Sequence, residues 1–93
     1  MENIEDALKK LLEGNKKHMK EEGAAERAKL AKGQAPKAAV LYCSDSREVA
    51  EKLLDSEKRG EIFGVRLAGS VASSEAIGSI VYAVEQLHVP LVL

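Results

Sequence analysis

The segment LYCSDSRE (residues 41–48) groups a thiol, two hydroxyls, a carboxylate and a guanidinium directly after an apolar run. Cys43, Asp45 and Arg47 are each two residues apart, so Arg47 can bind Asp45 through charge-assisted, bidentate hydrogen bonds. In an open parallel sheet, reactive side chains gather at the carboxyl ends of strands, where the chain turns. The segment is therefore a candidate reactive site if a strand precedes it.

The residue types alone leave three interpretations of this segment open. In the first, Cys43 is a buried structural residue, while Asp45 caps a following helix and forms an ordinary ion pair with Arg47. In the second, Ser44, Ser46 and Arg47 join the backbone N–H groups of the helix N-terminus to bind phosphate or bicarbonate. In the third, the segment is a reactive site. Spacing does not select among the three.

The elements around the segment follow from the hydrophobic pattern. Residues 38–43, AAVLYC, form a continuous apolar run, typical of a strand that is buried on both faces. Residues 61–69 predict a second strand that ends in a glycine turn. Between them, residues 48–58 predict a helix whose inward side chains are Val49, Leu53 and Leu54.

Residues 73–88 predict an amphipathic helix, with Ser73 or Ser74 as its cap and Glu75 in its first turn. Its inward face is expected to hold Ile77, Ile80, Val81, Val84 and Leu87. Residues 89–93, VPLVL, predict the start of a third strand.

The first third of the chain predicts a helical arm. Residues 3–22 form an amphipathic helix with Asn3 as its cap, and Gly23 interrupts it before a second short helix over residues 24–32. Pro36 then forces an extended chain. The apolar positions of the first helix are Ile4, Ala7, Leu8, Leu11, Leu12 and Met19.

The order helical arm, β, α, β, α, β predicts an α/β fold: a small parallel β-sheet of about three strands, with crossover helices. At 93 residues the chain is expected to be a single domain, with the arm at residues 1–35 and the βαβαβ region at residues 36–93. Such a thin sheet leaves unpaired edges. A homo-oligomer, most simply a dimer, is therefore expected.

Charge and cysteine content limit the partners and the compartment. Fourteen basic and fifteen acidic residues give a net charge of -1, which favours neither nucleic acid nor a membrane surface as a partner. One cysteine excludes an internal disulfide and fits a reducing compartment. Because no signal-peptide segment and no run of about 18 apolar residues is present, we expect a cytoplasmic protein.

The motif C-S-D-S-R after a strand resembles the first active-site motif of the β-class carbonic anhydrases. "GEIFGVRLAGSV" resembles that family's G-D-L-F-x-x-R-x-A-G-N-x-V, and "GSIVYAVEQLHVPLVL" resembles its S-I-E-Y-A-V-x-x-L-G-V-P-L-I-V. "ALKKLLEGNKKHM" is similar to the family's N-terminal helix. The resemblance covers nearly all of the chain, in order.

The resemblance implies a zinc enzyme that interconverts CO2 and bicarbonate, assembled from dimers whose N-terminal helices embrace the partner. Two cysteines and a histidine hold the family's zinc. By position, Cys43 would be the first thiolate ligand and Asp45 the carboxylate that contacts zinc or its water. Arg47 would orient Asp45 and keep it ionised.

The sequence also departs from the family pattern. The family's His-x-x-Cys motif, which supplies the other two ligands, follows the third strand, whereas this sequence ends at Leu93. His18 and His88 are not expected to replace those ligands, and Ser70 stands where the family usually has Asn. The expectation is a truncated N-terminal portion that is inactive alone.

The alternative hypothesis is a non-catalytic α/β module that binds an anion or assembles with itself. Abundant Ala, Lys and Glu at exposed helix positions are typical of an idealised sequence, and indicate a redesigned or reconstructed fragment.

Overall fold

The structure is a computed structural model that describes residues 2–93. The chain divides into two compact units, one ending at Lys32 and the other comprising Gly33–Leu93. Each unit is described by itself.

The first unit is the helix α1, Ile4–Leu30. Asn3 caps it, because the Asn3 side chain accepts a hydrogen bond from the N–H of Asp6 at 2.9 Å. At Gly23 the backbone has a φ of +76°, which breaks α1 into two helical segments, as the sequence predicts. Within Ile4–Leu30 no residue is buried in its own unit.

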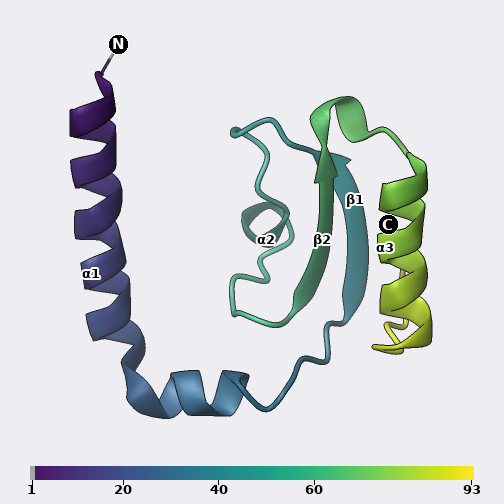
Figure 1. The fold of residues 1–93 in the computed structure, drawn as a ribbon. Coiled ribbons are helices and arrows are strands. Elements are labelled where there is room, and N and C mark those ends of the chain that lie inside the picture. Colours follow the sequence, from purple (N-terminus) through teal and green to yellow (C-terminus); the bar gives the residue numbers. More distant parts are fainter. Residues whose placement is uncertain (1) are drawn as a thin grey trace. The chain divides into compact units, whose positions relative to one another are not determined.

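The second unit is built on a parallel sheet (Figure 1). Strand β1, Ala38–Cys43, pairs with β2, Ile62–Leu67, in a register that sets Ala38 beside Ile62 and Cys43 beside Leu67. The predicted bounds of β1 are correct. The α/β class and the parallel sheet are confirmed.

The predicted third strand is present only as a short pairing on the other edge of β1. Val92 forms an isolated parallel bridge with Ala39. The N–H of Leu93 donates to the carbonyl of Ala39 at 2.8 Å. The N–H of Leu41 donates to the carbonyl of Leu93, also at 2.8 Å. Among residues 2–93, β1 therefore lies in the middle of the sheet, with two full strands rather than three.

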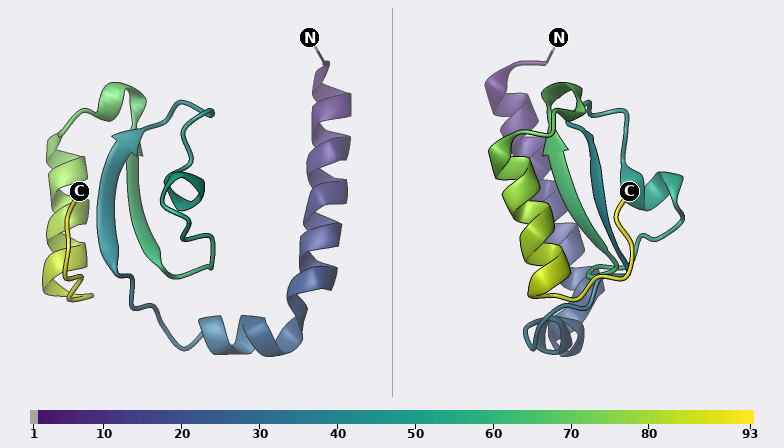
Figure 2. Two further views of the ribbon diagram at one scale, coloured as in Figure 1. Left: turned by 180° about the vertical axis from the view of Figure 1, so that it is seen from behind. Right: turned by 90° about the vertical axis from the view of Figure 1, so that its right-hand side faces the viewer.

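The two faces of the sheet carry separate apolar clusters, since successive side chains of a strand point to opposite faces. Ala38 and Val40 pack with Ala50 of α2, Ala50–Leu53. Ala39 packs on the opposite face with Ala83 of α3, Ser74–Glu85. The two helices accordingly lie on opposite sides of the strands (Figures 1 and 2).

The inward face of α3 agrees with the prediction only in part. Ser73 is its cap, as expected, with Oγ accepting from the N–H of Ala76 at 3.2 Å. Of the five residues expected inward, Ile80 and Leu87 are half-buried, and Leu87 packs against the cluster that contains Ala39 and Ala83. Ile77, however, is 51% exposed, and Val81 and Val84 are exposed too. The buried residues are the alanines at 76 and 83, because α3 approaches the sheet where Ala39 and Ala83 are both 0% exposed. Small side chains at the contact allow this close approach.

The helix α2 is also shorter than predicted, with four residues instead of a span over 48–58. Leu53, expected to point inward, is 72% exposed, and Leu54 is exposed as well. Ala50 supplies the contact with the sheet instead. The chain leaves the helix through Asp55, whose φ is +50°.

None of the helices in the described part of the chain, residues 2–93, is both long enough and apolar enough to cross a membrane.

Candidate active site

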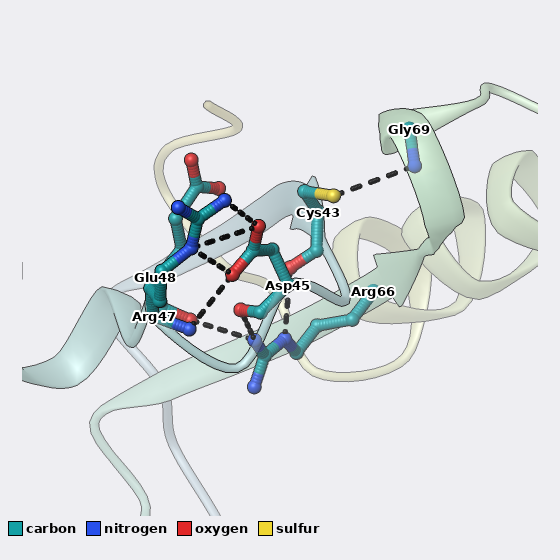
Figure 3. Close-up of polar contacts among 6 residues, drawn as sticks. All are labelled: Cys43, Asp45, Arg47, Glu48, Arg66 and Gly69. Atoms are coloured by element: carbon teal, nitrogen blue, oxygen red, sulfur yellow. Dashed lines mark hydrogen bonds and ion pairs between the residues drawn. The ribbon is translucent and has the colours of Figure 1, made fainter.

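The thiol of Cys43 lies at the carboxyl end of β1, the position that the sequence predicts. Its sulfur accepts a hydrogen bond from the N–H of Gly69 at 3.4 Å (Figure 3). Gly69 belongs to the 3-10 turn η1, Ala68–Ser70, that follows β2, and has a φ of +75°. Two neighbouring strand ends thus fix where the half-buried sulfur lies.

Asp45 and Arg47 form a bidentate ion pair in the loop after β1 (Figure 3). Nη2 of Arg47 donates to Oδ2 of Asp45 at 2.6 Å, and Nε donates to Oδ1 at 3.0 Å. The main-chain N–H of Arg47 also donates to Oδ1, at 2.9 Å. Three donors of one residue therefore aim the carboxylate, and the predicted pairing is present.

These contacts shift the pKa of both side chains. The Arg47 side chain, and after it the Arg47 main-chain N–H, hold the pKa of Asp45 below its ordinary value of 3.8. The positive charge of Arg66 lowers it further. The carboxylate in turn raises the pKa of Arg47. Asp45 is consequently ionised at neutral pH.

The predicted helix cap at this loop is absent. The residue before α2 is Val49, which makes no side-chain capping hydrogen bond. Oδ1 of Asp45 is taken by the N–H of Arg47, two residues on, while the N–H of Glu48 donates to the main-chain carbonyl of Asp45 at 3.0 Å. Asp45 thus stabilises a tight turn rather than the helix.

The candidate anion-binding hydroxyls of Ser44 and Ser46 lie in the same turn, and both residues are exposed. The N–H of Ser44 donates to the carbonyl of Leu67 at 3.1 Å, which ties the turn to β2. A four-residue helix offers only a small dipole to an anion. Anion binding by Ser44, Ser46 and Arg47 stays a prediction.

Arg66 is a site residue whose role the sequence pattern did not predict. From β2, its Nη2 donates to the carbonyls of Asp45 at 3.0 Å and Glu48 at 2.6 Å, and its Nε to that of Cys43 at 3.2 Å. The signal available in the sequence was its place in GEIFGVRLAGSV, three residues before Gly69, where the motif G-D-L-F-x-x-R-x-A-G-N-x-V that this segment resembles also has arginine. Only the strand register, which sets Tyr42 beside Arg66, brings it to the loop.

The side chains present suit zinc by type but are too few by themselves. A thiolate and a carboxylate are both zinc ligands, and catalytic zinc sites take three protein ligands. Among residues 2–93, no group of three or more His, Cys, Asp or Glu side chains is placed to hold a metal ion. The two histidines lie elsewhere. His18 is on α1, with its Nε2 atom 3.3 Å from Oε2 of Glu22, and His88 is in the turn after α3.

Comparison with known proteins decides the family. The family profile described as carbonic anhydrase matches residues 38–93, more than half of the chain. The chain belongs to the carbonic anhydrase family. The match includes both strands and the whole loop from Cys43 to Glu48.

Individual relatives show that the chain is similar to β-class carbonic anhydrases and corresponds to their N-terminal portion. It is 42% identical to carbonic anhydrase 2 of Mycobacterium tuberculosis, over 94% of this chain and 44% of that protein. Its fold is similar to the β-carbonic anhydrase CcaA, with a TM-score of 0.81 and 25% identity over 92% of this chain and 46% of that one. The chain thus spans less than half the length of the relatives it matches.

A third comparison concerns assembly. One of two tetrameric β-carbonic anhydrases from Sordaria macrospora matches with a TM-score of 0.66 and 28% identity, over 92% of this chain and 43% of that one. That description applies to the Sordaria proteins.

Proposed function

We propose that this chain supplies the first half of a β-carbonic anhydrase centre that interconverts CO2 and bicarbonate. The observation that carries the proposal is the position of the Cys43 thiol at the end of β1, two residues before Asp45. The Asp45 carboxylate is oriented by a bidentate ion pair with Arg47. Family membership and the pairing of Asp45 with Arg47 support it together.

Each side chain has a distinct role in this proposal. Cys43 is a zinc ligand, and zinc when bound lowers the pKa of a water molecule from about 15.7 towards about 7. Asp45, kept ionised by Arg47, is an acceptor that contacts the metal or accepts a hydrogen bond from the reacting water. Arg47 orients Asp45 and releases no proton itself, since its own pKa is raised.

The remaining zinc ligands, in this proposal, come from protein outside residues 2–93. The support is chemical: three protein ligands are needed, and the described residues offer one thiolate and one carboxylate at the site. We also propose that residues 1–93 alone do not hydrate CO2, and that the protein is cytoplasmic.

A chimera tests the proposal directly. Residues 1–93 are joined to the part of Mycobacterium tuberculosis carbonic anhydrase 2 that this chain does not match, and CO2 hydration is followed by stopped flow. We expect hydration by the chimera, loss of at least about 100-fold in Cys43→Ser, and no rate above buffer for residues 1–93. His18→Asn, on α1, is the control and keeps the rate. A folded chimera with no activity would contradict the proposal.

A second proposal concerns assembly. We infer that α1 binds a second copy of the chain, because its apolar residues have no cover within its own unit. Ile4, Leu8, Leu11, Leu12 and Met19 are all at least half exposed. Such a set of exposed apolar side chains on one helix marks an interaction site.

Light scattering tests this assembly. We expect a dimer or a higher oligomer from residues 1–93, and a monomer when Leu8 and Leu12 are both changed to Lys. A wild-type monomer would contradict the assembly but not the zinc proposal.

A further inference from the structure

Three main-chain carbonyls of the candidate site converge on one side chain, that of Arg66. Its Nε donates to the Cys43 carbonyl and its Nη2 to the carbonyls of Asp45 and Glu48, at 3.2, 3.0 and 2.6 Å. These bonds join the first, third and sixth residues of a six-residue segment (Figure 3). A planar guanidinium with several N–H donors is suited to such a set of acceptors, whereas a lysine offers a single nitrogen.

The guanidinium is itself held in place by an aromatic ring. The Cζ atom of Arg66 lies 4.6 Å from the centroid of the Tyr42 ring, which is a cation–π contact. The Tyr42 ring in turn lies over Gly64, where an added Cβ would be 3.4 Å from the Cε1 and Oη atoms of Tyr42. Gly64, Tyr42 and Arg66 thus stack on one face of the sheet, next to the loop.

We propose that Arg66 is the positioning residue that fixes the segment Cys43–Glu48, so that the Cys43 thiol and the Asp45 carboxylate keep one relative arrangement. This inference rests on the function proposed above. Because its donors reach the carbonyls of both Cys43 and Asp45, Arg66 acts on the two functional side chains through their backbone. It touches neither the Cys43 sulfur nor the Asp45 carboxylate oxygens by hydrogen bond, in contrast to Gly69 and Arg47.

The test measures local backbone order in residues 1–93, without zinc. In ¹⁵N relaxation of the wild type, the amides of residues 44–48 are expected to have order parameters near about 0.85. In Arg66→Gln and Arg66→Lys the same amides are expected to fall below about 0.6, while the amides of α3 stay near about 0.85. Lys58→Gln, which also removes one positive charge before β2, is the control and leaves the loop rigid.

The stacked ring provides a second pair of variants. Tyr42→Phe keeps the ring under the guanidinium and is expected to keep the loop ordered, whereas Tyr42→Leu removes it and is expected to loosen residues 44–48. A loop that stays rigid in both Arg66 variants would overturn the proposal. So would a loss of order that extends equally into α3, because Arg66 would then support the fold in general.

A zinc measurement links the inference to function. In the chimera described above, Arg66→Gln is expected to weaken zinc binding by about 10- to 100-fold. This is the usual effect of mutating a residue that orients a metal ligand without contacting the metal. Unchanged zinc affinity in Arg66→Gln would count against positioning. If Cys43 binds no zinc in the wild-type chimera, the proposed function fails, and the order parameters still decide the role of Arg66.

Discussion

Nη2 of Arg47 lies 2.6 Å from Oδ2 of Asp45, and Nε of the same guanidinium lies within 3.2 Å of both carboxylate oxygens. The Arg47 side chain is 87% exposed and that of Asp45 is 30% exposed, so solvent screens their attraction. The pair therefore serves mainly to orient and ionise Asp45. Its contribution to folding is small.

The protonation of Asp45 should depend on Arg47. The folded pKa of Asp45 lies below its ordinary value of 3.8, so the pair stabilises the fold above about pH 4 and stops doing so as the pH falls through the folded pKa. In Arg47→Gln the pKa of Asp45 should rise, as followed by NMR titration of its carboxyl carbon. The low-pH loss of stability should shrink accordingly.

Lys37 gives a matched control for that titration. Its side chain donates to Glu61 at 2.8 Å and holds the pKa of Glu61 below its ordinary value. Lys37→Gln should raise the pKa of Glu61 and leave that of Asp45 where it is. An Asp45 titration that is the same in wild type and Arg47→Gln would contradict the account of the pair.

Gly64 should tolerate only a small side chain. A Cβ at this position meets the Tyr42 ring at 3.4 Å, which is ordinary contact, so Gly64→Ala should change the free energy of unfolding by less than about 0.5 kcal/mol. Gly64→Val adds two methyl groups towards the ring and should cost about 1–3 kcal/mol. Urea unfolding measures both. Equal stabilities of the two variants would show that the ring does not pack there.

His88 should be a site of stored backbone strain. Its φ is +55°, in the left-handed region, where the chain turns so that the N–H of Val89 donates to the carbonyl of Ala83 at 3.2 Å. His88→Gly should raise the free energy of unfolding by about 1 kcal/mol, since glycine adopts this conformation without a steric penalty. His88→Ala keeps the penalty and serves as the control. Equal effects of glycine and alanine would contradict the explanation.

The orientation of α3 can be tested at two adjacent positions. Ala83 is fully buried against the sheet, so Ala83→Leu should cost about 1–3 kcal/mol through overpacking. Val84 is exposed, so Val84→Leu should stay within about 0.5 kcal/mol of the wild type in thermal or urea unfolding. The opposite order of effects would support the inward face that periodicity predicts.

These two positions also show what the sequence could and could not predict. The run at residues 38–43 identified β1, because both faces of that strand are covered, and the spacing of Asp45 and Arg47 identified their pair. Periodicity alone identified only part of the inward face of α3, since Leu87 packs on the core cluster whereas Val84 is exposed. It favours large apolar side chains such as Val84, while the contact depends on small residues that let helix and sheet approach.

The role of Arg66 could not be predicted for a different reason. Arg66 and Glu48 are 18 residues apart in sequence, and their contact depends on strand register and on the turn that Asp45 forms. Neither is a property of a local pattern. The length of α2 was overestimated likewise, because residues 48 and 49 precede the helix and the chain leaves it after Leu53, turning at Asp55 with a φ of +50°.

The proposed function requires Cys43 to be a zinc ligand in a carbonic anhydrase centre. X-ray absorption at the zinc edge of the zinc-loaded chimera tests it most directly, with Cys43→Ser and His18→Asn measured beside it. We expect zinc–sulfur scattering at about 2.3 Å in the wild type and in His18→Asn, and weaker scattering in Cys43→Ser. A folded wild-type chimera whose zinc–sulfur signal is unchanged by Cys43→Ser, or that holds no zinc, would contradict it.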